Sequence, residues 1–173
     1  MFKISTRVIA ISAMTAALYT AMCVALAPIS YGAVQIRVAE ALTLLPVISP
    51  VFIIGVTVGC LLSNIVGLMT GANIIGVMDI VFGTAATFAA AVLTYKLRKI
   101  KIGKIPVLAA LPPVIINAVV IGAELMFVEA GGFNLKLFLF NASYVGLGQT
   151  AACFLVGLPL VYFLPKALRV EGL

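Results

Sequence analysis

Three polar side chains, Gln35, Arg37 and Glu40, fall within six residues of a strongly apolar part of the sequence. A charged side chain at the centre of a bilayer costs roughly 2.5–3.5 kcal/mol on insertion scales, so charges inside membrane segments are rare and usually functional. A guanidinium, a carboxylate and an amide together offer donors and acceptors to a polar ligand. We therefore expect this stretch to form part of a ligand-binding site.

A second interpretation is that Arg37 and Glu40 only neutralise each other. Residues 37–45 are expected to form a short helix that ends at Pro46, because proline disfavours helical geometry for the residue before it. On that helix Arg37 and Glu40 are three positions apart and adjacent on the surface. Gln35 and the free amide donors of the helix start would still leave polarity unused at this point.

Other apolar segments also contain polar residues. Asn117 and Glu124 are seven residues apart, so a helix presents them on one face. A buried Glu124 needs a proton, a partner or a ligand, and we favour a partner or ligand. Asp79 fits either a helix start, where the macrodipole favours a carboxylate by about 0.3–1 kcal/mol, or a ligand contact. Asn73 fits a turn equally well.

Composition identifies the class of protein. Hydrophobic residues make up 64% of the sequence and charged residues 9%, against about 45–50% and 25% in soluble domains. A spanning helix needs about 20 apolar residues, so the 173 residues predict an all-α integral membrane protein. We expect a single transmembrane domain, residues 1–173, with a bundle of six helices. The expected spans are residues 8–27, 37–48, 51–69, 77–95, 106–128 and 137–164.

The distribution of positive charge predicts the topology. If the N-terminus is cytoplasmic, nine of the eleven Lys and Arg residues face inward, and only Arg37 and Lys136 face outward. This asymmetry follows the positive-inside rule, and it places both termini in the cytoplasm. The basic segment 96–104 is then a cytoplasmic loop rather than a nucleic-acid site. The same topology places residues 30–40, Asn73, Asp79, Glu124 and the start of the last span near the outer leaflet. A shared depth is what a binding pocket requires.

Several chemistries have no support in the sequence. It contains no histidine, and the three cysteines lie far apart in apolar runs, so we expect no metal site, disulfide or other cofactor in this chain. It also contains no Gly-x-x-x-x-Gly-Lys-Ser/Thr phosphate loop. Any work driven by ATP would therefore depend on partner proteins. The isolated acids and the lack of a nucleophile argue against an enzyme.

Small residues mark two helix faces. Ala13, Ala17 and Ala21 recur at a spacing of four in the first expected span, and Gly55 and Gly59 form a Gly-x-x-x-Gly pair in the third. Small side chains let helix backbones approach closely in a membrane. The glycine pair is expected to pack within the bundle, whereas the alanine face suits either internal packing or docking to a separate subunit.

One motif resembles the signature of the QueT family, the substrate-binding S components of energy-coupling factor (ECF) transporters for queuosine precursors. It consists of Ser30-Tyr31-Gly32, Gln35, Arg37, Glu40-Ala41-Leu42 and Leu45-Pro46. The resemblance extends over essentially the whole chain, including Asp79 with the following Phe82-Gly83-Thr84.

This resemblance implies a six-helix S component of a plasma-membrane ABC importer, surrounded by lipid, that captures its substrate from outside. Transport would require a transmembrane T subunit and two cytoplasmic ATPases, which would use the ATP. The loaded S component would reorient in the membrane, and its docking surface usually includes small residues on the first helix. The resemblance therefore favours docking for Ala13, Ala17 and Ala21.

The implied substrates are 7-deazaguanine bases such as preQ1, preQ0 or queuine, whose pyrimidine edge has N–H donors beside a carbonyl. We expect Glu40 or Glu124 to accept those donors, and Gln35 or Asn141 to meet the carbonyl. Arg37 would then hold an acidic side chain in place. The full set of expected substrate residues is Tyr31, Gln35, Arg37, Glu40, Asn73, Asp79, Asn117, Glu124, Asn141 and Tyr144, with the tyrosines stacking on the base and Asp79 near a cationic aminomethyl arm. The alternative function is a proton-coupled secondary transporter of a nucleobase-like or vitamin substrate that uses Glu124 as its proton relay.

Overall fold

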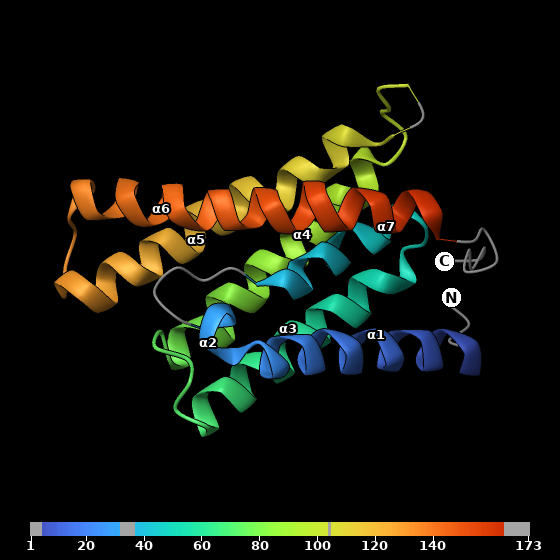
Figure 1. Ribbon diagram of the computed structural model, residues 1–173. Coiled ribbons are helices and arrows are strands. Elements are labelled where there is room, and N and C mark those ends of the chain that lie inside the picture. The colour runs from blue at the N-terminus through green and yellow to red at the C-terminus, as the bar shows by residue number, and fades with distance from the viewer. Residues whose placement is uncertain (1–4, 32–36, 104, 165–173) are drawn as a thin grey trace.

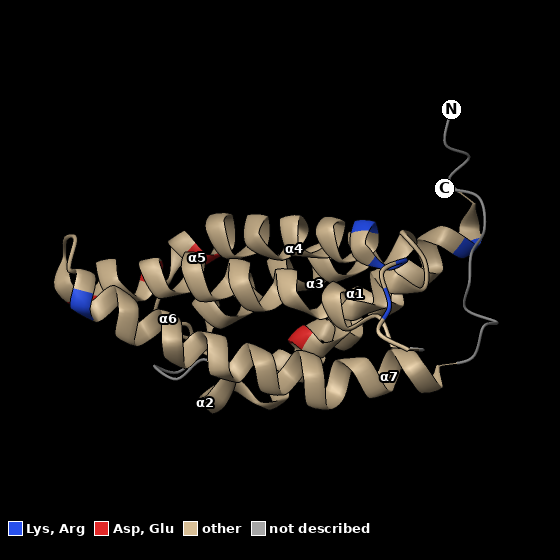
Figure 2. Ribbon diagram, turned by 90° about the horizontal axis from the view of Figure 1, so that it is seen from above, with Lys and Arg blue, Asp and Glu red and all other residues tan. Residues whose placement is uncertain are grey.

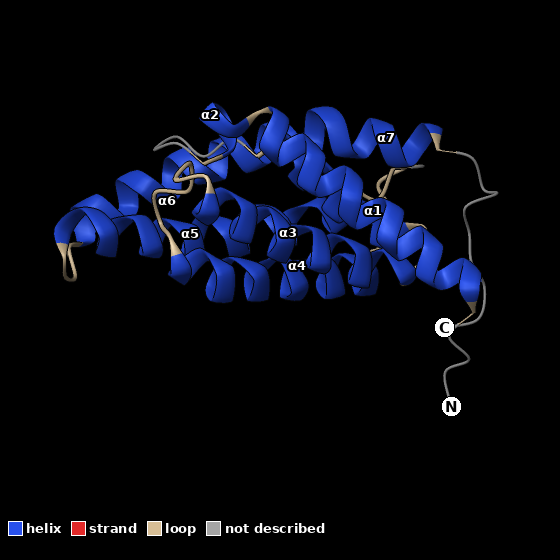
Figure 3. Ribbon diagram, turned by 90° about the horizontal axis from the view of Figure 1, so that it is seen from below, coloured by secondary structure: helices blue, strands red, loops and turns tan. Residues whose placement is uncertain are grey.

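The chain folds as a bundle of helices in the computed structural model, which describes residues 5–31, 37–103 and 105–164. Figure 1 shows long helices running side by side, and Figure 3 shows that the connections between them are short. No strand occurs in these segments. The elements are α1 Thr6–Ala25, α2 Ala27–Ser30, η1 Val38–Val47, α3 Val51–Met69, η2 Asp79–Gly83, α4 Thr84–Leu97, η3 Val107–Ala110, α5 Leu111–Ala130, α6 Leu135–Thr150, η4 Ala151–Gly157 and α7 Leu158–Phe163.

Five helices are long and apolar enough to cross a membrane. They are Thr6–Ala25, Val51–Met69, Asp79–Leu97, Val107–Ala130 and Leu135–Phe163. The expected second span is instead a 10-residue 3-10 helix, η1, which is shorter than the roughly 20 residues that a spanning α-helix needs. The described part of the chain is thus an all-helical membrane protein with five candidate spans and one short apolar helix.

The short helix η1 lies in the middle of the bundle. It contacts α1, α3, α4, η3, η4 and α7, and every residue from Ala39 to Pro46 is buried. It was expected to end at Pro46, but it includes this proline and ends at Val47. A proline so close to a helix end interrupts little, since few backbone bonds remain to be lost there. Because η1 is buried on all sides, it holds the polar residues at its start in the centre of the bundle.

Glycines let α1 and α3 pack closely, as the sequence predicted for the Gly55 and Gly59 pair. A Cβ atom at Gly55 would lie 2.7 Å from Cβ of Thr15, and one at Gly59 would lie 2.7 Å from Cβ of Tyr19. Contacts this short are sterically excluded, so only glycine permits the observed separation of the two helices. The consequence is that Tyr19 is pressed fully into the core, where it is 0% exposed.

Two long helices contain π-helical segments. η2 precedes α4 without a break, and η4 lies between α6 and α7 in the helix from Leu135 to Phe163. A π-helical turn adds a residue to the helix and is frequent at functional sites. Both segments border the polar centre of the bundle: η2 begins with Asp79, and η4 packs against η1.

Charge is distributed unevenly along the bundle. The start of α1, the end of α7 and the connection from α4 to η3 lie at one end of the molecule in Figure 1. Figure 2 shows Lys and Arg residues gathered at that end, while α6 begins at the opposite end with Lys136 as its one basic residue. This arrangement is the one that the positive-inside rule describes for a cytoplasmic end.

Candidate functional site

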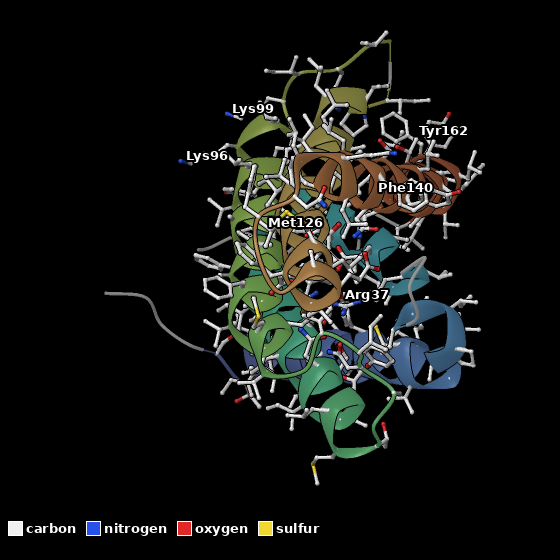
Figure 4. All side chains as sticks on the ribbon, turned by 90° about the vertical axis from the view of Figure 1, so that its left-hand side faces the viewer. Arg37, Lys96, Lys99, Met126, Phe140 and Tyr162 are labelled. Atoms are coloured by element: carbon white, nitrogen blue, oxygen red, sulfur yellow. The ribbon has the colours of Figure 1, made fainter. Side chains whose placement is uncertain are left out.

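A buried ion pair joins Arg37 to Asp79. The Arg37 guanidinium donates to the Asp79 carboxylate, and the two side chains are 4% and 0% exposed. Arg37 also donates from Nε to the carbonyl oxygen of Ser30 at 3.2 Å. In Figure 4, Arg37 lies inside the bundle whereas Lys96 and Lys99 project from its edge. The interpretation that Arg37 neutralises Glu40 is therefore wrong, because its partner is 42 residues further along the chain.

The local backbone explains this choice of partner. Arg37 is the N-cap of η1 and has an extended conformation, with φ −86° and ψ 95°. The rule that helical residues three apart face each other applies only within the helix. Arg37 thus pairs with Asp79 rather than with Glu40, and Asp79 is the acidic side chain that it holds.

Two asparagines surround Asp79. Asn73 donates from Nδ2 to Asp79 Oδ2 at 2.9 Å, and its Oδ1 accepts from the backbone N–H of Ile75 at 3.1 Å. Asn73 thus serves the turn and the polar cluster together. Asn64 of α3 donates to the backbone carbonyl of Asp79 at 2.6 Å. Asp79 lies in the first turn of its helix, where the macrodipole favours a carboxylate, and Arg37 and Asn73 bind its carboxylate there.

Glu40 has a separate set of partners. The Tyr19 hydroxyl donates to Oε1, and Asn117 of α5 donates from Nδ2 to Oε2 at 3.1 Å. Glu40 is 1% exposed. Both of its oxygens are therefore hydrogen-bonded by residues that lie on two different helices.

Glu124 is the third buried acid and differs from the other two. It is 3% exposed, and neither of its carboxylate oxygens has a hydrogen-bond partner among the described residues. It follows Ile121 by one turn on the α5 face that also carries Asn117. An unpaired buried carboxylate is costly, so this side chain requires an explanation beyond packing.

A narrow space separates the two networks of bonded acids. Its lining comes from η1, from η2 and α4, and from α5 and α6. The residues are Arg37, Glu40, Gly83, Thr87, Asn117, Ile121, Val145 and Gln149. The walls are close together, with no room for a group the size of water. A ligand would therefore have to separate these elements when it binds.

The other expected substrate residues lie at different places. Tyr31 is 1% exposed, has the Arg37 guanidinium 5.5 Å from its ring centre, and donates from its hydroxyl to the Ser63 carbonyl at 2.6 Å. Asn141 donates to Glu129 Oε2 at 2.9 Å. Tyr144 is 43% exposed and packs on Phe140 at 4.6 Å between ring centres, so it faces outward rather than into the polar centre. Gln35 lies outside the described residues.

Four residues at this site were not among the sequence candidates: Tyr19, Asn64, Thr87 and Gln149. Each is polar and buried within an otherwise apolar helix. Polarity inside a predicted span was the available signal, and it applied to Asn64 and Gln149 as clearly as to Asn117. Tyr19 was harder to identify, because its aromatic ring suits a membrane helix without any polar partner.

The alanine face of α1 is not used inside the bundle. Ala13, Ala17 and Ala21 are all exposed, whereas Thr15, Ala16, Tyr19 and Cys23 form the buried face. The Gly55 and Gly59 pair of α3 meets this second face. Internal packing is thus excluded as the explanation of the alanine spacing within the described residues.

Comparison with known proteins gave one match. Searches of curated proteins and of solved structures found no similar protein. A model of the family described as QueT transporter matches residues 9–166. This range includes every helix apart from the first three residues of α1, and every polar residue of the buried centre. The chain belongs to the QueT transporter family.

Proposed function

We propose that this protein is the substrate-binding S component of an ECF-type importer, and that it takes up a queuosine precursor, a 7-deazaguanine base such as preQ1, preQ0 or queuine. The observation that supports this most strongly is the set of buried polar side chains around Arg37, Glu40 and Glu124 in a member of a transporter family. Charges inside membrane helices are retained mainly where a substrate or ion is bound.

The chemistry of the cluster suits such a base. A 7-deazaguanine presents adjacent N–H donors next to a carbonyl oxygen, and carboxylates accept paired donors in charge-assisted bonds. Amide groups such as those of Asn117 and Gln149 both donate and accept, so they can meet the carbonyl and the remaining N–H groups. Asp79 has a guanidinium partner already, which makes it less suited to the aminomethyl arm than the sequence alone suggested.

We propose that energy comes from a transmembrane T subunit and two cytoplasmic ATPases, in the plasma membrane. The sequence has no phosphate loop of its own. The exposed alanine face of α1 offers a surface on which another helix can pack closely. The basic end of the bundle (Figure 2), where α1 starts and α7 ends, would then face the cytoplasm.

Calorimetric titration of the detergent-purified chain tests the substrate proposal. We expect tight, one-to-one binding of preQ1 without any other subunit, and weaker binding of guanine. Queuine and preQ0 rank the preference for the group at position 7. Failure to bind any deazaguanine would contradict the proposal, while leaving the family and the membrane architecture unchanged.

A second candidate function is proton-coupled secondary transport. The unpaired Glu124 carboxylate inside a candidate span is the kind of group that relays protons in transporters. In vesicles that contain only this chain, an imposed pH gradient would then drive uptake. We expect no uptake under these conditions, and uptake after the T subunit, ATPases and ATP are added.

A further inference from the structure

The buried charges do not balance. Among the described residues, three buried side chains are acidic, Glu40, Asp79 and Glu124, and one is basic, Arg37. The remaining described Lys and Arg residues lie at the ends of the bundle (Figure 2). A low-dielectric interior disfavours unpaired charge strongly. The centre is therefore short of hydrogen-bond donors and of positive charge, and an occupant that brings donors would correct the first of these deficits.

Glu124 is the buried acid that lacks hydrogen-bond donors on both of its oxygens. Both Glu40 oxygens accept hydrogen bonds, from Tyr19 and Asn117. Asp79 is neutralised by Arg37. Its Oδ1, which also lacks a hydrogen-bond partner among the described residues, lies against the helix backbone, where a Cβ atom at Gly83 would collide with it. These two acids are already engaged in holding η1 to α1, α5 and η2. Glu124 has two free oxygens and no such structural task.

Glu124 lies on the same face of α5 as two residues that line the narrow space described above. Asn117 and Ile121 line that space together with Arg37 and Glu40, and Glu124 follows on the same face of α5. Gln149 of α6 lines the space near Asn117, and its Oε1 also lacks a partner among the described residues.

The distance between Glu124 and Gln149 indicates how long a ligand that reaches both of them would be. Seven residues separate Asn117 from Glu124, which is about 10 Å along a helix. A Cβ atom at Gly146 would lie 3.4 Å from Cβ of Ala118, so Gln149 lies near the Asn117 end of this interval. A flat bicyclic base with a short arm spans a similar distance, with one edge at Glu124 and its other end toward Gln149.

We propose that Glu124 is the residue that reads the base, with its two carboxylate oxygens accepting the ring N–H and the exocyclic 2-amino group of a 7-deazaguanine. Glu40 and the Arg37–Asp79 pair are then positioning residues that hold the surrounding helices. This inference rests on the proposed substrate class. It goes beyond it by assigning recognition to one of the buried acids and by requiring that the ligand carry two adjacent N–H donors.

A double comparison of protein and ligand tests the assignment. Calorimetry would compare wild type and Glu124→Gln, each with preQ0 and with its 2-deamino analogue. Loss of a charged hydrogen-bond partner should weaken wild-type binding of the analogue about 10- to 100-fold relative to preQ0. In Glu124→Gln, preQ0 itself should bind 10- to 100-fold more weakly, and removal of the 2-amino group should then change affinity by less than about threefold.

Stability measurements separate recognition from folding. Glu124→Gln removes an unpartnered charge, so its thermal unfolding midpoint in detergent should equal or exceed that of wild type. Glu40→Gln keeps one acceptor oxygen where Glu40 has two. It therefore loses the hydrogen bond from either Tyr19 or Asn117 and should lower the midpoint. Glu129→Gln is the matched control, because Glu129 is exposed and a glutamine oxygen can still accept the hydrogen bond from Asn141. It should leave both affinity and midpoint unchanged.

Each outcome has a distinct meaning. If wild type binds no deazaguanine, the proposed substrate class fails. If wild type binds preQ0 and Glu124→Gln binds it equally well, the substrate class stands and this assignment is overturned. A variant that loses affinity for preQ1 but keeps it for preQ0 also overturns it, because Glu124 would then contact the cationic arm and not the ring edge.

Discussion

At the scale of residues, the Arg37–Asp79 ion pair is the interaction whose disruption should destabilise the bundle most. Both side chains are buried, and removing one partner of a buried pair leaves an uncompensated charge at a cost of about 3–5 kcal/mol. We expect Asp79→Asn to lower the free energy of unfolding by about that amount, measured by denaturation in detergent. The double variant Arg37→Met with Asp79→Leu should lose less than Asp79→Asn alone. Equal stability of Asp79→Asn and wild type would contradict a structural role for the pair.

Sequence reasoning at this scale identified polarity but not pairing. It correctly selected Arg37, Glu40, Asn73, Asp79, Asn117 and Glu124 as polar residues of the apolar segments, and all of them are buried. It could not find the partner of Arg37, because the extended N-cap conformation that turns Arg37 toward Asp79 is set by tertiary packing. Nor could it tell that Tyr144 faces outward, since a tyrosine fits the core and the membrane boundary equally well.

At the scale of elements, the close contact between α1 and α3 restricts which side chains are tolerated at Gly59. Ala at position 59 would place Cβ 2.7 Å from Cβ of Tyr19, which must push apart the helix that supports Glu40. Overpacking of this kind costs about 1–3 kcal/mol, and we expect Gly59→Ala to unfold at lower temperature and to bind ligand more weakly. Gly146→Ala is the control, because its nearest neighbour would be at 3.4 Å. Equal behaviour of the two variants would argue against a tight α1–α3 contact.

The helical elements were largely predictable, with one exception. Long apolar runs bounded by polar or proline residues are specific signals for spanning helices. The segment from Val38 to Val47 has the same composition but folds as a short 3-10 helix. Periodicity does not distinguish a short buried helix from a spanning one when both are apolar on all sides. Only the packing of six neighbouring elements around η1 shows its central position.

At the scale of the whole molecule, the exposed alanine face of α1 is the surface on which the proposed partners would dock. Replacing Ala13, Ala17 and Ala21 by leucine adds bulk to an exposed face, so ligand binding by the isolated chain should not change. Association with the T subunit and ATPases should be lost, because close helix packing no longer fits. Co-purification and uptake in vesicles measure this. Ala85→Leu with Ala89→Leu on the exposed side of α4 is the control, and equal loss in both variants would contradict docking at α1.

The two ends of the bundle differ in how deeply they can enter a bilayer. Arg7, Lys96, Arg98, Lys99 and Lys101 belong to the basic end, and Lys136 is at the other. Each such charge resists immersion by about 2.5–3.5 kcal/mol. If the substrate-loaded protein tilts during transport, the basic end must stay at the membrane surface. The Lys136 end would then move through the hydrocarbon. An added lysine near Gly132 would then slow each transport cycle without weakening capture of the substrate.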